Sequence, residues 1–198
     1  PMGNWVIDEA CRQLREWHLQ GHTDWSMAVN LSTLQFEQPS LIKTVLDCLT
    51  RHSVPPGMLI LEVTETTAMS NPDESVRVLT ALTDAGVKAS IDDFGTGYSS
   101  LLYLKRLPAC ELKIDRAFVK ELSGESEDAT IVSAIIALAK TLNLKVVAEG
   151  VETAAQQTFL TELGCNTLQG YLLGKPITAQ AIMEQCQHGE MSPSRMQS

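Results

Sequence analysis

Six short apolar runs recur along the chain and predict β-strands. Each is six or seven residues long, and together they cover 26–32, 59–65, 88–94, 111–116, 145–151 and 167–172. Four longer stretches place apolar residues at i, i+3 and i+4, the spacing of a helix with one buried face, at 40–52, 73–86, 128–143 and 153–164. Gly86 and Gly164 lie at the ends of two of these helices, where a left-handed residue can terminate a helix.

This alternation predicts a parallel α/β fold. A new strand begins about every 28 residues, which is the repeat of a strand followed by a covering helix. With 198 residues, 44% of them hydrophobic, the chain can bury the core of one globular domain. The period alone leaves two architectures open, an open doubly wound sheet and a closed (β/α)8 barrel.

Polar residues at the strand ends favour the barrel. Every predicted strand carries them near its C-terminal end: Asn30, Glu62, Asp92 with Asp93, Lys113 with Asp115, Glu149, and Gln169. A barrel brings all its strand ends around one mouth, whereas a doubly wound sheet gathers residues from two or three strands. Because side chains alternate along a strand, Lys113 and Asp115 should point inward while Leu112 and Ile114 face the helices.

A ring of strand-end carboxylates indicates a metal site. It would contain Glu62, Asp92, Asp93, Asp115 and Glu149. Two like charges 4 Å apart repel by roughly 4 kcal/mol at an effective dielectric of about 20, so such a ring needs cations. Oxygen ligands without His or Cys favour Mg²⁺ or Mn²⁺, and a metal pair beside a lysine suits attack of water on a phosphodiester. One such carboxylate has an ordinary structural explanation, and the coincidence across six strands favours a shared site.

Two other motifs have weaker interpretations. His18 and His22 have the i, i+4 spacing of a zinc pair, but no third ligand is near, which favours an ordinary surface helix end. The string DFG at 93–95 resembles the magnesium loop of protein kinases, but the sequence lacks the kinase catalytic-loop and glycine-rich motifs.

The amino-acid composition limits the kinds of partner and compartment that the chain fits. The net charge of -9, with 15 scattered Lys and Arg, argues against binding to a nucleic-acid polymer. Five widely spaced cysteines without a C-x-x-C pair indicate neither a zinc cage nor a disulfide framework, and favour the cytoplasm. The longest apolar run, 131–139, is too short to cross a bilayer, so we expect no membrane insertion by this chain. The chain starts at Pro1 without an initiator Met, which suggests a piece of a longer protein, and that parent could still be membrane-anchored.

Six longer motifs stand at the predicted strand ends: NLSTLQF (30–36), LEVTET (61–66), IDDFGTGYSSL (91–101), LKIDRAFV (112–119), VVAEGVET (146–153) and LQGYLLGKP (168–176). In this order and spacing, they resemble those of a known bacterial family, the EAL-domain cyclic di-GMP phosphodiesterases. The resemblance extends from about Gly3 to Ile182.

The resemblance implies a (β/α)8 TIM-like barrel that hydrolyses cyclic di-GMP to pGpG with Mg²⁺ or Mn²⁺. The implied metal ligands are Asn30, Glu62, Asp92, Asp93 and Glu149, with Asp115 close by. Lys113 would orient or deprotonate the attacking water, Gln169 would lie near the second metal, and Glu65 would hold the loop after Gly95. It also implies a homodimer formed through the loop and helix after Asp93, and a parent protein with GGDEF or sensor domains.

One departure from the family pattern is the missing Glu-Ala-Leu motif, whose glutamate is a metal ligand in the family. The nearest string, DEACRQL at 8–14, belongs to a helix that follows that motif in the family. We therefore expect an N-terminally incomplete barrel at 1–186, with about six of eight strands, and a polar tail at 187–198. A non-catalytic cyclic di-GMP receptor or interaction module is the main alternative, and a magnesium-dependent barrel acting on a carbonyl substrate through Lys113 is a third.

Overall fold

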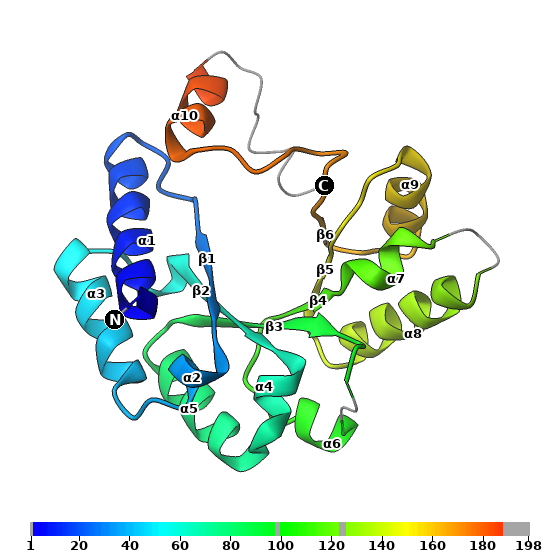
Figure 1. Cartoon of the computed structure of the whole chain (residues 1–198), viewed down its shortest axis with the longest axis horizontal. Helices are drawn as coiled ribbons and strands as arrows, with labels where there is room; N and C mark the ends of the chain where they lie inside the picture. Colours follow the sequence, from blue (N-terminus) through cyan, green and yellow to red (C-terminus); the bar gives the residue numbers. More distant parts are fainter. Residues whose placement is uncertain (1, 98–99, 123–125, 188–198) are drawn as a thin grey trace. The chain divides into compact units, whose positions relative to one another are not determined.

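Strands and helices alternate along the chain in the computed structural model, which describes residues 2–97, 100–122 and 126–187 (Figure 1). The strands are β1 (Met27–Leu31), β2 (Leu59–Thr64), β3 (Lys88–Phe94), β4 (Glu111–Ile114), β5 (Lys145–Ala148) and β6 (Thr167–Leu168). The helices are α1 (Met2–Leu19), α2 (Thr33–Phe36), α3 (Leu41–His52), α4 (Glu65–Ser70), α5 (Pro72–Asp84), α6 (Leu101–Leu104), α7 (Arg116–Lys120), α8 (Glu127–Thr141), α9 (Ala154–Glu162) and α10 (Ala179–Gln187), with a 3₁₀ turn at Pro56–Met58. The strands follow one another in the sheet in sequence order.

All six predicted strands and all four predicted helices are confirmed; five of the strands end earlier than predicted, and β3 has the predicted bounds. Four pairs of neighbouring strands are parallel, as the α/β interpretation requires: β1–β2, β2–β3, β4–β5 and β5–β6. The stretch 8–14 lies in helix α1. Helices α2, α4, α6 and α7 have four to six residues, too few to show a helical period in the sequence.

The chain divides into two compact units. The first contains the residues up to Asp92 together with Gly97–Cys110. In it, α1 packs against both α3 and β1, and Figure 1 shows α1 and α3 side by side. Leu59, Leu61 and Val63 on β2 are fully buried. A parallel sheet covered by helices buries such apolar rows, and this packing forms the core of the first unit.

The second unit contains Asp93–Thr96 and the residues from Glu111 onward. Helix α8 packs against β4 and β5, and the carboxyl-terminal helix of the described chain is α10. Leu112 and Ile114 on β4 are fully buried and Lys113 between them is 4% exposed. The unit therefore buries an apolar face and a charged side chain from one short strand.

The helices that follow the strands start at side-chain caps. Ser32, Thr64, Asp115 and Thr153 are the N-caps of α2, α4, α7 and α9, and each accepts a hydrogen bond from a backbone N–H in the first turn. Such caps satisfy helix donors that have no partner within the helix. Local hydrogen bonds thus fix the turns that leave the carboxyl ends of β1, β2, β4 and β5.

Two further predictions concern His18 and the polar tail. His18 is 8% exposed and its Nε2 lies 2.9 Å from the Trp25 carbonyl, so the predicted surface position was wrong for this residue. Its ring packs at the end of α1, where the chain folds back through Trp25 toward β1. Of the predicted tail, Gln187 is the last residue of α10, and 188–198 lie outside the described residues.

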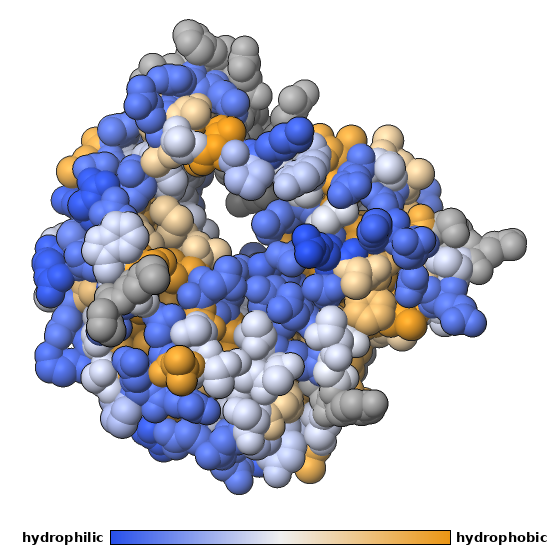
Figure 2. All heavy atoms as spheres, in the orientation of Figure 1, coloured by the Kyte–Doolittle hydropathy of each residue, from blue (hydrophilic) through white to orange (hydrophobic). Residues whose placement is uncertain are grey.

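The visible surface is mostly polar, with isolated apolar patches (Figure 2). One patch lies over α2, the helix that carries Leu34, whose side chain is 77% exposed. Single exposed leucines are common on soluble folds and need no partner. None of the described helices has the length and apolar character required to cross a membrane. All five cysteines are free thiols.

Candidate metal centre

Three polar residues of the first unit occupy neighbouring positions on β1, β2 and β3. Asn30 is the register partner of Glu62, and Glu62 is the partner of Ser90, two positions before Asp92. Glu62 and Asp92 are each 7% exposed, and Ser90 is fully buried. Because alternate residues share a face of a strand, Ser90 and Asp92 lie on the face opposite Ala89 and Ile91. The sequence pattern therefore places two buried carboxylates on the polar face of adjacent strands.

The second unit contains a buried ion pair. Lys113 Nζ lies 2.7 Å from Glu149 Oε1, with side-chain exposures of 6% and 19%. The Glu149 backbone N–H also donates to the Ile114 carbonyl at 3.2 Å, which ties the first residue after β5 to β4. The predicted inward orientation of Lys113 agrees with its burial. The ammonium group carries a positive charge into a region rich in carboxylates, where it offsets part of their repulsion.

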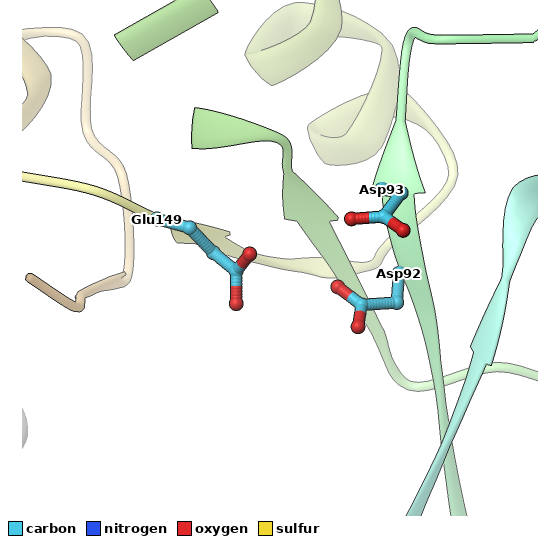
Figure 3. A group of neighbouring side chains, drawn as sticks. All are labelled: Asp92, Asp93 and Glu149. Atoms are coloured by element: carbon cyan, nitrogen blue, oxygen red, sulfur yellow. The ribbon is translucent and has the colours of Figure 1, made fainter. Parts of the chain in front are cut away.

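Asp92, Asp93 and Glu149 form a group whose three carboxylates can each offer one oxygen, all within 4.8 Å of one another. Figure 3 shows Asp92 and Asp93 at the end of β3 with their carboxylates directed to the side from which Glu149 approaches. Oxygen donors without sulfur or imidazole are the set that hard divalent cations prefer. The donor chemistry and spacing of this group fit a divalent metal ion.

The backbone at Asp93 is unusual. Its φ is 53°, in the left-handed region, and Gly95 follows with φ 102°. A non-glycine residue in this region carries strain, which Asp tolerates better than most residues, and such strain concentrates at functional sites. This turn directs adjacent carboxylates of one strand toward a common point, although neighbours on a regular strand face opposite sides.

Glu65 lies under the loop that follows β3. It is the first residue of α4 and is 1% exposed. The Gly97 backbone N–H donates to Glu65 Oε2 at 3.3 Å, and a Cβ at Gly97 would lie only 3.1 Å from Glu65 Oε1. Glu65, Thr66, Met69, Ser70 and Gly97 line an open pocket of about 330 Å³. The carboxylate therefore contacts the loop directly, at a position where a glycine leaves room for it.

Asp115 and Gln169 lie at strand ends but outside the group of three carboxylates. Asp115 caps α7, with Oδ1 accepting from the Ala117 N–H at 2.8 Å. Gln169 is exposed, and its backbone N–H donates to the Ala148 carbonyl at 2.8 Å. The tight group within 4.8 Å is Asp92, Asp93 and Glu149, and the wider ring that adds Glu62 and Asp115 stays a prediction.

Sequence reasoning did not single out Gln156. This side chain is 6% exposed on α9 and links the turn after β5 to the end of α7. The signal in the sequence was Thr153-x-x-Gln156, the spacing of a capping box at a helix start.

Comparison with known proteins places these features in a family. Residues 1–176 match the family model described as "EAL domain". Over 182 residues, or 92% of it, the chain is 63% identical to the bifunctional diguanylate cyclase/cyclic di-GMP phosphodiesterase MucR of Pseudomonas aeruginosa, of which it covers 27%. It is 46% identical over 188 residues to the signaling protein YkoW of Bacillus subtilis, matching 93% of this chain and 23% of YkoW. The chain thus spans about a quarter of the length of these curated relatives.

Solved structures show the same fold. A complex of the MucR phosphodiesterase with cyclic di-GMP superposes with a TM-score of 0.89 at 64% identity, covering 91% of this chain and 73% of that one. The EAL domain of Mycobacterium smegmatis DcpA gives a TM-score of 0.90 at 37% identity, covering 97% and 86%. These likenesses confirm the predicted fold class, the α/β fold of the EAL type, and this chain belongs to the EAL domain family.

Proposed function

We propose that this chain hydrolyses cyclic di-GMP to the linear dinucleotide pGpG. The observation that carries the proposal is the convergence of Asp92, Asp93 and Glu149 within 4.8 Å, beside the buried Lys113–Glu149 pair. Three relatives that are 63%, 45% and 36% identical are named as cyclic di-GMP phosphodiesterases: MucR, NbdA and PdeR. This supports a phosphodiester substrate over a carbonyl compound.

The donor set favours a two-metal centre containing Mg²⁺ or Mn²⁺. Asn30, Glu62 and Asp92 would hold one ion, and Asp93 and Glu149 would complete the other, with Asp115 at the adjoining strand end. When bound, such ions lower the pKa of water and neutralise negative charge on the phosphodiester. The chain itself supplies oxygen donors on the ends of several parallel strands, which fixes their spacing before any ligand arrives.

The remaining site residues act on the water and on the loop. Lys113, whose ammonium group is held by Glu149 at 2.7 Å, would orient the attacking water, and only its neutral amine form would deprotonate that water. The Gln169 amide would hydrogen-bond near the second metal. Glu65 would hold the loop after Gly95 through the Gly97 N–H. Lys113, Glu149, Gln169 and Glu65 are therefore the residues whose substitution should impair turnover most directly.

Assembly belongs to the same proposal. We infer a homodimer through the segment after Asp93, because Leu101 and Leu102 of α6 are 59% and 68% exposed. Tyr98 and Ser99, in the same segment, lie outside the described residues. The chain matches about a quarter of MucR and of YkoW, which supports a parent protein with GGDEF or sensor domains. We place the chain in the cytoplasm, where this nucleotide would be its substrate.

A second candidate function is reception of cyclic di-GMP without hydrolysis. The specific observation in its favour is that the sequence contains no Glu-Ala-Leu string, whose glutamate is a metal ligand in the family. A site with fewer ligands can still hold the nucleotide through its other contacts. The two candidates predict the same binding and differ in whether product forms.

The experiment incubates the 198-residue chain with cyclic di-GMP and either Mg²⁺ or Mn²⁺, and follows pGpG by chromatography. Hydrolysis is supported if pGpG forms only when the metal is present and if the rate of its formation falls at least about 100-fold in Glu62→Gln. Binding of cyclic di-GMP in equilibrium dialysis without product identifies a receptor. Equal turnover by Glu62→Gln, or turnover in excess chelator, would contradict the metal-assisted mechanism.

A further inference from the structure

Gln156 is a buried amide whose two ends bind different elements of the second unit. Its Oε1 accepts from the backbone N–H groups of Glu152 and Thr153, at 2.8 and 2.9 Å. Its Nε2 donates to the carbonyls of Val119 and Lys120, at 2.9 and 3.3 Å. The side chain is 6% exposed, so these bonds are shielded from water. One residue thus joins the start of α9 to the end of α7.

The two joined elements follow β4, which carries Lys113, and β5, which Glu149 directly follows. Helix α7 begins directly after Asp115, the first residue after β4, and the α9 cap lies four residues after Glu149. The Glu149 N–H already donates to the Ile114 carbonyl. A Cβ at Gly150 would lie 2.6 Å from Arg116 Cβ, so this loop packs against the start of α7 without space for a side chain.

The turn after β5 is therefore held against the β4 side at both ends. Glu149 and Gly150 contact the first residues after β4, and Gln156 fixes the far end of the turn to the last carbonyls of α7. Removing the Gln156 contact leaves one end of the turn without this restraint. Displacements of about 1 Å in a supporting shell are enough to impair a metal or catalytic site.

We propose that Gln156 is a positioning residue, which holds the turn carrying Glu149 against α7 so that the Glu149 carboxylate stays in place for metal binding. This inference rests on the proposed function of the carboxylate group. Gln156 is not among the residues proposed to touch the substrate or the metal. It acts through the backbone of Glu152 and Thr153 on one side and of Val119 and Lys120 on the other.

The test uses two variants that separate the two ends of the amide. Gln156→Glu keeps the acceptor for Glu152 and Thr153, and a carboxylate in the first turn of α9 preserves the capping box. It places that carboxylate against two carbonyl oxygens, so only the contact with α7 is lost. In Gln156→Met, the new side chain has a similar length but makes neither the Oε1 nor the Nε2 hydrogen bonds. Affinity for Mn²⁺ alone is measured by calorimetry at pH 7.5, and thermal denaturation is followed on the same samples.

Asn166→Ala is the matched control. The Asn166 Oδ1 accepts from the Val146 N–H at 2.8 Å and holds the opposite half of β5. We expect both Gln156 variants to bind Mn²⁺ about tenfold more weakly than the wild type. We expect Asn166→Ala to lower the melting temperature while it keeps the wild-type affinity for Mn²⁺.

The outcomes separate the inference from the proposed function. A wild-type chain that binds no Mn²⁺ contradicts the proposed metal centre, and the positioning role fails with it. Mn²⁺ binding by the wild type together with an unchanged affinity in Gln156→Glu overturns the positioning role alone. An equal loss of affinity in Asn166→Ala would also overturn it, because the effect would then be one of general stability.

Discussion

At the scale of single residues, Lys113 determines how a cluster of carboxylates can exist inside a folded chain. It is 4% exposed on β4 and pairs with Glu149 at 2.7 Å. Burial of a charge is costly unless an opposite charge is close, and the same pairing reduces repulsion between the carboxylates. The ammonium group is thus part of the structure of the site as well as of its proposed chemistry.

Lys113→Met should destabilise the metal-free chain by about 3 kcal/mol, because Glu149 loses its charge partner while the acidic neighbours remain. Lys145→Met, at the exposed start of β5, is the control and should change the free energy of unfolding by less than about 0.5 kcal/mol. Urea denaturation in the presence of a chelator measures both. Equal midpoints for the two variants would show that the Lys113 pair adds no stability.

Asp93 combines a proposed role as a metal ligand with a strained backbone, and two substitutions separate the two. Asp93→Asn tolerates φ 53° and should keep the free energy of unfolding within about 1 kcal/mol, while Asp93→Val should lose about 1–3 kcal/mol. Both should lose turnover of cyclic di-GMP, since neither offers a carboxylate. Denaturation curves compared with product formation test this, and an Asp93→Asn chain with full turnover would remove Asp93 from the metal site.

At the scale of elements, the turns after the strands place the functional side chains. Alternation along β4 predicted that Lys113 points inward, on the face opposite Leu112 and Ile114, and its burial beside Glu149 agrees. Two features of the turns could not be predicted in the same way. The positive φ of Asp93 depends on packing of the loop. The hydrogen bonds of Gln156 to Val119 and Lys120 span separations of 37 and 36 positions in the sequence. The predicted ring that adds Glu62 and Asp115 stays a prediction, because strand-end position does not determine side-chain distance, as the capping role of Asp115 shows.

Gly150→Ala should destabilise the chain because φ is 72° and the new Cβ would lie 2.6 Å from Arg116 Cβ. We expect a loss of more than about 1 kcal/mol, with weaker Mn²⁺ binding. Gly174→Ala is the matched control, since a Cβ at Gly174 would have nothing within 4 Å and its φ is not positive. Thermal denaturation gives the comparison. A Gly150→Ala chain as stable as the wild type would mean that the turn can move away from α7.

Helices α1 and α3 are linked by Asp8, which accepts from Arg51 at 2.6 Å and lies 3.0 Å from His52 Nε2. The hydrogen bond with His52 is the main cause that holds the pKa of Asp8 below its ordinary value of 3.8. A lowered folded-state pKa contributes stability above pH 3.8 that is lost as the pH falls through the folded value. Asp8→Asn should therefore cost up to about 1 kcal/mol at pH 7, and the difference from wild type should shrink below pH 3.8 in urea titrations. A destabilisation by Asp8→Asn that grows as the pH falls would contradict a lowered pKa of Asp8 in the folded chain.

At the scale of the whole molecule, the sheet order leaves β1 and β6 in the terminal positions among the strands that the structure describes. Ala28 and Asn30 on β1 are exposed. A strand with an open edge offers backbone hydrogen bonds to another chain, and natural proteins protect such edges with charges.

Ala28→Lys should therefore reduce concentration-dependent association of the chain, because it places a charge on the exposed side of β1. Ala155→Lys, on the exposed surface of α9, is the control and should leave association unchanged. Light scattering over a range of concentrations measures the mass. Leu102→Glu tests the separate proposal of a dimer through α6. Unchanged association in Ala28→Lys would mean that the β1 edge is not the contact.

The sequential strand order also has a consequence for how the chain is made. Met27 pairs with Leu59, Ile60 with Lys88, Glu111 with Lys145 and Val147 with Thr167, so these partners are only 20 to 34 residues apart. Each strand finds its neighbour in the segment synthesised just before it. The closure entropy of such loops is modest, and the sheet can grow one strand and helix at a time as the chain leaves the ribosome.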